Sequence, residues 1–284
     1  MTEFIGDLAR FPFLQYALLA GFLVSIACGI MGSYVVARRI SYIAGAIAHS
    51  VLGGMGAARY GEVVFGLSWF HPLLGAIAAA LISALVIGLV SLRAREREDT
   101  VIGAVWAIGM AVGILFIFKT PGYNENLMSY LFGNILMVSR EDLWLTAGLN
   151  LLILVTGLVF YRQFLAVCFD EEFVLLRGLK VQAYYLLLLS LIAFTVVLLV
   201  SVVGIIMVIA LLTLPAATAS YFSRRLWHMM GLSVIFSILF TSGGLALSYA
   251  PGLPAGATII IFAGIVYLLV AAVSSALGGR RFIA

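Results

Sequence analysis

Runs of about 20 mostly apolar residues recur along the whole chain, separated by short segments that carry most of the charged residues. A helix of that length rises about 30 Å, which matches the hydrocarbon thickness of a bilayer. We therefore expect spanning helices over residues 13–36, 42–60, 72–92, 100–118, 143–161, 183–202, 204–222, 228–249 and 256–277.

One apolar run, 183–222, continues for 40 residues almost without interruption. As a single helix it would be about 60 Å long, twice the hydrocarbon thickness, so the chain must fold back within it. We place the break at residues 201–204, Ser-Val-Val-Gly. The pattern predicts an all-α polytopic membrane protein with about nine transmembrane helices, eight being the alternative count.

The composition of the chain fits a bundle of spanning helices better than a soluble core. Hydrophobic residues make up 64% of the 284 residues and charged residues only 10%, with a mean hydropathy of +1.20. No long linker or polar domain interrupts the pattern, so we expect residues 1–284 to form a single transmembrane domain. Glu3 and Asp7 near the start argue against a cleavable signal peptide. Cys28 and Cys168 have no CxxC spacing, and we interpret them as packing residues.

Basic residues are distributed unevenly over the predicted loops. If the first span runs from outside to inside, one membrane face receives 12 of the 16 basic residues. The positive-inside rule then places the N-terminus outside and the C-terminus in the cytoplasm. The net charge of +4 therefore reflects topology and not nucleic-acid binding. The 12 residues are Arg38, Arg39, Arg93, Arg95, Arg97, Arg162, Arg177, Lys180, Arg224, Arg225, Arg280 and Arg281; Arg10, Arg59, Lys119 and Arg140 lie on the other face.

The segment 119–142 contains an apolar stretch, 127–138, that is too short to cross the membrane. Both of its ends must lie outside, so we predict a short outer-face or re-entrant helix covered by protein or water. Glu125, between two asparagines, precedes this helix and is a candidate to meet a cation in an outer vestibule. The alternative is that these residues form a polar turn that caps the helix.

The cytoplasmic loop after the fifth predicted span has the charge pattern of a short helix. Asp170, Glu171 and Glu172 lie near its N-terminus, Arg177 lies near its other end, and Gly178 is placed to terminate it. Such a helix between two spans offers a docking site for a cytoplasmic partner. The alternative is an ordinary solvated connector.

A single histidine, His49, lies within the second predicted span, in the sequence SYIAGAIAHSVLGGMGAA. A group that ionises or binds metal at bilayer depth is costly and usually has a function. Neutral imidazole binds zinc well, and manganese or iron with help from oxygen ligands. His49 is therefore the candidate ligand on a metal pathway. The alternative is a structural histidine, hydrogen-bonded to a backbone carbonyl or to Ser50.

Two further residues near the outer face are weaker candidates. His71, in SWFHP, and Glu62 could offer a first stop for an arriving ion. Residues in such a position, beside Trp69 and Phe70, more often belong to the interfacial aromatic belt.

Five strings resemble, in order and spacing, the membrane permease subunit of bacterial ABC importers for zinc, manganese or iron. They are GSYVVARRISYIAGAIAHSVLGG, DTVIGAVWAIGMAVGIL, NLMSYLFGNIL, VVGIIMVIALLTLPAATA and PAGATIII, and the resemblance runs from about Leu18 to Tyr267. It implies a homodimer paired with cytoplasmic ATP-binding subunits and fed by an extracytoplasmic metal-binding protein. It also supports the coupling role of the loop helix and the position of His49 on the metal path.

One position departs from the family pattern. Many members have an aspartate four residues before this histidine, which gives a carboxylate–imidazole pair on one helical face; here the residue is Gly45. The symmetry-related His49 of a second copy could supply another ligand. The string LMSYLFGNIL favours the zinc importers, by resemblance only. The transported divalent ion is cargo, and no permanently bound cofactor is expected.

Other functions are less consistent with the sequence. The chain has no phosphate-binding glycine–lysine loop and no hydrolase motif, so we expect a transport subunit and not an enzyme. A gradient-driven secondary transporter would be expected to bury acidic residues, and none falls within a predicted span. An iron-chelate or vitamin permease of related architecture is the other alternative, although a central histidine would have no evident use there.

Overall fold

The computed structural model describes residues 2–8, 10–67, 69–93, 98–121, 133, 135–169, 175, 178 and 180–276. Within these residues the secondary structure is entirely helical. All nine predicted spans correspond to helices. The helices are α1 (Thr2–Leu8), α2 (Pro12–Ala37), α3 (Ser41–Phe65), α4 (Pro72–Arg93), α5 (Glu98–Lys119), η2 (Ile135–Met137), α7 (Arg140–Val159), α8 (Tyr161–Phe169), α10 (Val181–Val203), α11 (Ile205–Ser220), α12 (Leu226–Tyr249) and α13 (Ala255–Ala276).

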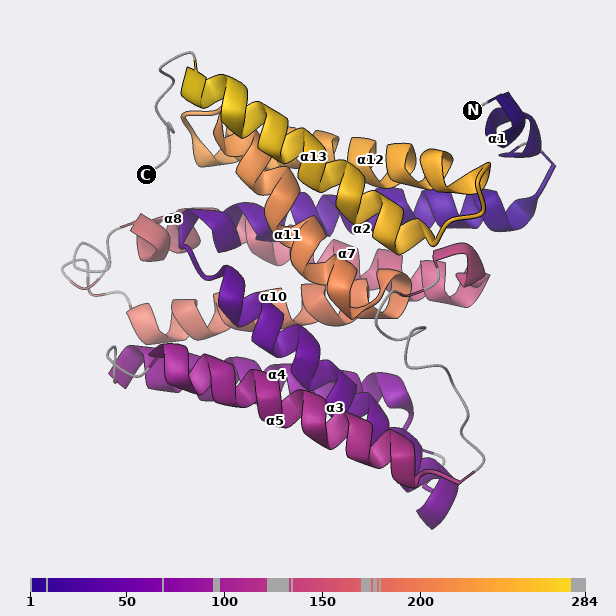
Figure 1. Cartoon of the computed structure of the whole chain (residues 1–284). Coiled ribbons are helices and arrows are strands. Elements are labelled where there is room, and N and C mark those ends of the chain that lie inside the picture. The colour runs from indigo at the N-terminus through magenta and orange to yellow at the C-terminus, as the bar shows by residue number, and fades with distance from the viewer. Residues whose placement is uncertain are drawn as a thin grey trace.

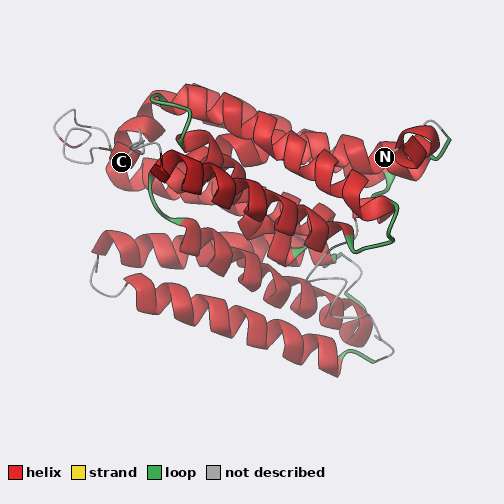
Figure 2. Cartoon of the chain, turned by 45° about the horizontal axis from the view of Figure 1, so that its top comes forward, coloured by secondary structure: helices red, strands yellow, loops and turns green. Residues whose placement is uncertain are grey.

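Seven helices of the described part, α2, α4, α5, α7, α10, α12 and α13, are long and apolar enough to cross a membrane. Helix α11 has only 16 residues, fewer than a full crossing requires. Helix α3 has 25 residues but carries His49, Arg59, Glu62 and several glycines, which lower its hydropathy. The long helices run lengthwise through the bundle, as expected for a polytopic membrane protein (Figure 2).

The predicted break in the long apolar run is confirmed at Gly204. Helix α10 ends at Val203 and α11 begins at Ile205. Gly204 has φ +82° and ψ +165°, a backbone conformation that is accessible almost only to glycine. The chain therefore turns at one residue, and α11 crosses the bundle obliquely (Figure 1).

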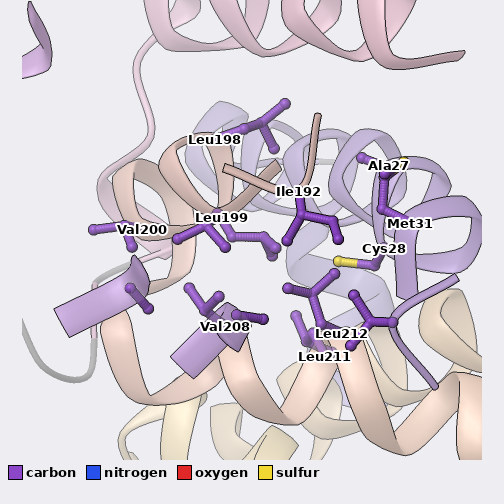
Figure 3. Close-up of a cluster of buried hydrophobic side chains, with 14 of the residues drawn as sticks. Ala27, Cys28, Met31, Ile192, Leu198, Leu199, Val200, Val208, Leu211 and Leu212 are labelled. Atoms are coloured by element: carbon purple, nitrogen blue, oxygen red, sulfur yellow. The ribbon is translucent and has the colours of Figure 1, made fainter. Parts of the chain in front are cut away.

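The core lies where α2, α10 and α11 meet. Leu and Ile side chains of α10 and α11 pack against Ala27, Cys28 and Met31 of α2 (Figure 3). On one side of this core α3, α4 and α5 form a closely packed group, and on the other side α12 and α13 pack against α2 and α11 (Figure 1). Helices α5 and α13 bury little of their own surface, so they form the outer edges of this chain.

The ends of the helices sort the basic residues as predicted. The C-terminal ends of α2 and α4 and the N-terminal ends of α10 and α12 lie at one end of the bundle (Figure 1). Arg38, Arg93, Lys180 and Arg225 belong to these helix ends or adjoin them. The starts of α2 and α13 lie at the opposite end. The charge asymmetry read from the sequence thus corresponds to two ends of one bundle.

Three short elements flank the long helices. Helix α1 was not predicted; it is held to α12 because Tyr249 donates a hydrogen bond to Asp7 Oδ2 (2.9 Å) and packs edge-on against Phe4. Helix α8 continues from α7 after a turn at Phe160. Of the predicted short helix 127–138, the structure describes a 3₁₀ turn at Ile135–Met137 and Gly133; residues 122–132 lie outside the described part.

A candidate metal pathway at His49

Helix α3 presents His49 on the stripe that faces α5. Gly45, His49, Gly53 and Gly56 recur at intervals of three or four residues, which places them on one helical face. A Cβ atom at Gly53 would lie 2.8 Å from the carbonyl oxygen of Gly109, so the two backbones pack together without side chains between them. His49 is the one large side chain on this stripe, and the stripe positions before and after it, Gly45 and Gly53, are glycines.

The His49 ring is buried and stacked. It is 9% exposed, and its plane lies 20° from the indole ring of Trp106 in α5, with ring centroids 4.5 Å apart. Nδ1 is buried and, among the described residues, has no hydrogen-bond partner. Ser50 does not supply one; its hydroxyl donates to the carbonyl oxygens of Ala46 (2.9 Å) and of Val105 in α5 (3.3 Å). Within the described part of the chain, no protein group uses this imidazole nitrogen.

Gly45 leaves the space in which the tryptophan lies. A Cβ atom at Gly45 would approach the Trp106 ring to 2.8 Å at Cζ3 and 3.2 Å at Cη2, and Ile209 of α11 to 3.4 Å. The space that a side chain four residues before the histidine would need is thus filled by the indole. No carboxylate accompanies the imidazole from this helix, as the sequence indicated.

The surroundings of the His49 stripe are otherwise apolar. An apolar pocket of about 350 Å³ lies beside it between α3, α4 and α5, and Ser50 and Ser83 are its polar lining residues. Within the described part of the chain, no three His, Cys, Asp or Glu side chains come together as a set that could hold a metal ion. One copy of these residues therefore offers a single ligand and not a closed, high-affinity site.

His71 and Glu62, both described, form no hydrogen bond or ion pair with each other. Glu62 pairs with Arg59 on the same helix, with 2.8 Å between Oε2 and the guanidinium. His71 is exposed and lines a separate pocket of about 350 Å³ between α3, α4, α7 and α10, together with Glu141 and Asp142. Asp142 is already engaged, because it accepts hydrogen bonds from the backbone and hydroxyl of Ser139 in the capping box of α7.

Several predicted residues lie outside the described part of the chain. These are Glu125 of the outer segment and four residues of the predicted coupling helix, namely Asp170, Glu171, Glu172 and Arg177. Gly178 is described: it has φ +71°, and its N–H donates to the carbonyl oxygen of Leu175 (2.9 Å). That geometry is typical of a residue that ends a helix, while the coupling role itself stays a prediction.

Sequence reasoning missed Trp106. A usable signal was present, since Trp106, Gly109 and Gly113 are spaced by three and four residues and so share one face of α5. The two glycines of that face resemble the small-residue contacts of membrane helices. Matching this face to the Gly45–Gly56 face of α3 would have placed the indole close to His49.

The fold and the site together define a class: a polytopic helical membrane protein with a buried imidazole inside its bundle, whose Nδ1 has no hydrogen-bond partner among the described residues. Comparison with known families makes the assignment specific. Residues 10–274 match the model of the ABC 3 transport family. The chain belongs to this family, and the resemblance inferred from its motifs is confirmed.

Relatives over nearly the full length agree with the assignment. A "Probable metal transport system membrane protein" of Chlamydia trachomatis is 44% identical over 258 residues, covering 91% of this chain and 88% of the relative. A "Manganese transport system membrane protein" of Halalkalibacterium halodurans is 35% identical over 269 residues, with coverage of 95% and 90%. The solved structure of PsaBC from Streptococcus pneumoniae in complex with Fab aligns with a TM-score of 0.83 at 32% identity, covering 95% of this chain and 94% of that one.

Proposed function

We propose that the protein is the permease subunit of an ATP-driven importer that carries divalent transition-metal ions, manganese foremost, across the bacterial inner membrane. The observation that carries this proposal is the buried imidazole of His49, whose Nδ1 has no partner among the described residues. A polar atom in that state within a spanning bundle is costly and needs a reason. A descending cation supplies one.

His49 acts in this proposal as a transient ligand. A closed four-ligand site would hold the ion, whereas a single neutral imidazole can bind it and release it. A second copy of the chain, related by a two-fold axis, would add its own His49 without a further motif. No acidic residue is needed in the same span.

The choice of metal rests on two arguments that point in different directions. The sequence favoured zinc, and imidazole without a carboxylate suits zinc better than manganese. The relatives that are named by their ion carry manganese in the name, at 31–35% identity over 94–95% of this chain. We place manganese first because the whole-chain likeness outweighs the preference of one ligand, and we keep zinc as the second candidate.

The partners follow from the family. We infer two copies of this permease, two cytoplasmic ATP-binding subunits and an extracytoplasmic metal-binding protein. The positively charged end of the bundle faces the cytoplasm, with the N-terminus outside and the C-terminus inside. The loop after α8, from Asp170 to Gly178, is the proposed contact with the ATP-binding subunits.

The test is uptake by the complete complex in proteoliposomes. The permease, its ATP-binding partner and the metal-binding protein are reconstituted, and entry of radioactive manganese is followed with ATP enclosed on the cytoplasmic side. We expect uptake that vanadate abolishes and that ionophores leave unchanged. Competing zinc is expected to reduce manganese uptake less than unlabelled manganese does at equal concentration.

Each outcome has a defined meaning. Uptake that survives vanadate but collapses with an ionophore would contradict the ATP-driven importer and favour a gradient-driven transporter. Stronger competition by zinc than by manganese would reverse the order of the two metals. Uptake of an iron chelate or a vitamin, with none of the bare ions, would replace the proposal with the chelate permease.

A further inference from the structure

The Trp106 indole covers two residues on one face of α3, Gly45 and His49. The Trp106 indole occupies the space above Gly45, 2.8 Å from where a Cβ atom would be, and lies parallel to the His49 ring four residues further along. Any side chain at Gly45 would compete with the indole for that space. The position of the tryptophan thus depends on the glycine.

The His49 imidazole is shielded from solvent, but the protein does not satisfy its hydrogen-bonding capacity. Nδ1 is excluded from solvent and has no partner among the described residues, a state that is costly for a buried polar atom. A histidine kept only for packing would be expected to find a carbonyl or hydroxyl, as the nearby Ser50 does at Ala46. The stacking fixes the plane of the His49 ring while leaving this nitrogen free.

Helix α5, which carries the tryptophan, packs closely against α3. The contact between the two helices is made largely by glycine backbone: Gly53 against Gly109, and Gly56 against Gly113, where a Cβ atom would lie 2.9 Å from the carbonyl oxygen. Side chains also cross this contact, because the Ser50 hydroxyl donates to the carbonyl oxygen of Val105 (3.3 Å) and the Tyr60 ring packs against Phe116. Helix α5 is also one of the least buried helices of the chain.

We propose that Trp106 is a positioning residue that covers His49 in this conformation and moves aside when an ion reaches the imidazole. Gly45 is the residue that makes the covered state possible. This inference rests on the proposed function, because it assigns a gating role on the same route. It adds that access to the imidazole is controlled by α5.

The test measures the chemical accessibility of each histidine and does not require transport. The reconstituted complex is treated with diethyl pyrocarbonate, a small uncharged reagent that modifies unprotonated imidazole, and modification of each histidine is followed by mass spectrometry. His71 and His228 are exposed and serve as internal standards. We expect His49 in the wild type, without nucleotide, to react at least 10-fold more slowly than both.

Variants separate covering from general packing. Trp106→Ala is expected to raise the rate at His49 about 10-fold, and Trp106→Phe to restore most of the protection because a phenyl ring can also stack. Gly45→Ala is expected to raise the rate as well, since its Cβ displaces the indole. The double variant should react no faster than the faster single variant, because both changes remove the same cover.

Two results would overturn the inference. One is a wild-type His49 that reacts as fast as His71; the other is a Trp106→Ala variant whose His49 stays protected while the rates at His71 and His228 show an intact fold. Failure of manganese uptake by the wild type would contradict the proposed function but leave the labelling result readable. The two failures are therefore distinguishable.

Discussion

At the scale of single residues, His49 differs from many of the buried hydroxyl side chains in how its polar atoms are satisfied, although Thr146, Ser233 and Ser237 are also without a partner among the described residues. The hydroxyls of Ser25, Ser33 and Thr195 donate to the carbonyl oxygen four residues earlier, at 2.6–2.8 Å. This return to the helix backbone lets short polar side chains reside in lipid at little cost. His49 makes no such bond, and none of the described residues offers a partner to its Nδ1.

Sequence reasoning found this residue and missed its environment. The sequence places His49 in an apolar span, where a single histidine stands out from the apolar residues around it. The indole that covers it was not predicted, because Trp106 comes from another span and looks like any aromatic residue of the membrane. The environment of a side chain depends on tertiary packing, which a single sequence specifies only indirectly.

Cys168, in α8 beyond the end of the α7 span, provides a prediction at this scale. Burial raises the pKa of its thiol to about 12, although the Arg38 guanidinium opposes the shift. At pH 8 only about one thiol in ten thousand is then ionised, and the thiolate is the reactive form. In a Cys28→Ala background we expect maleimide to label Cys168 very slowly at pH 8, with a rate that rises about tenfold per pH unit up to pH 10.

The contrast with an ordinary cysteine makes that prediction testable. An exposed thiol with a pKa of about 8.5 would be labelled rapidly, and its rate would level off above pH 9. Labelling of Cys168 with that profile would show that the packing of α8 against α2 and α10 is absent in the membrane.

At the scale of helices, lengths and ends could be predicted while neighbours could not. Bilayer thickness sets the length of an apolar helix, so all nine predicted segments are helices, with the break at Gly204, although α11 is shorter than a full crossing. The partner of each helix is not encoded in hydropathy, since every face of a membrane helix is apolar. Helix α1 was missed because it is short, and α8 because it continues directly from a span.

Glycine pairs, and not large side chains, decide which helices pack most closely. Gly54 of α3 and Gly75 of α4 face each other so closely that a Cβ atom at Gly54 would overlap the Gly75 carbonyl oxygen and lie 2.6 Å from Ala79 Cβ. The contacts of α3 with α4 and α5 are accordingly the two most extensive in the molecule. Helix α3 is held between its neighbours by backbone on both sides.

This packing predicts a large effect from one methyl group. Gly54→Ala should destabilise the permease by about 1–3 kcal/mol, because the helices have to separate to admit the new carbon. The matched control is Gly103→Ala in α5, where nothing lies within 4 Å of the new carbon. Thermal unfolding of the purified proteins in detergent measures both. A Gly54→Ala midpoint equal to that of Gly103→Ala would contradict the α3–α4 contact.

At the scale of the whole molecule, the placement of charges predicts the orientation in the membrane, and the placement of glycines determines which helices pack closely. The basic residues cluster at one end of the bundle and predict its orientation, which concerns the membrane and not the fold. The α2, α10 and α11 core gives rigidity, while the α3–α5 contact places His49 near a less buried edge of the chain. A rigid core beside the glycine-lined contact of α3 and α5 is suited to a protein that must alternate between two states.

The most direct test of the account compares three versions of the reconstituted complex in ATP-driven manganese uptake: wild type, His49→Ala and His228→Ala. His228 is exposed at the start of α12 and contacts only Trp227 among the described aromatic rings. Equal expression, assembly with the ATP-binding subunit and basal ATP hydrolysis are confirmed first. We predict that His49→Ala lowers uptake at least 100-fold while His228→Ala retains it. Undiminished uptake by His49→Ala would show that the ion does not pass this imidazole and would contradict the account.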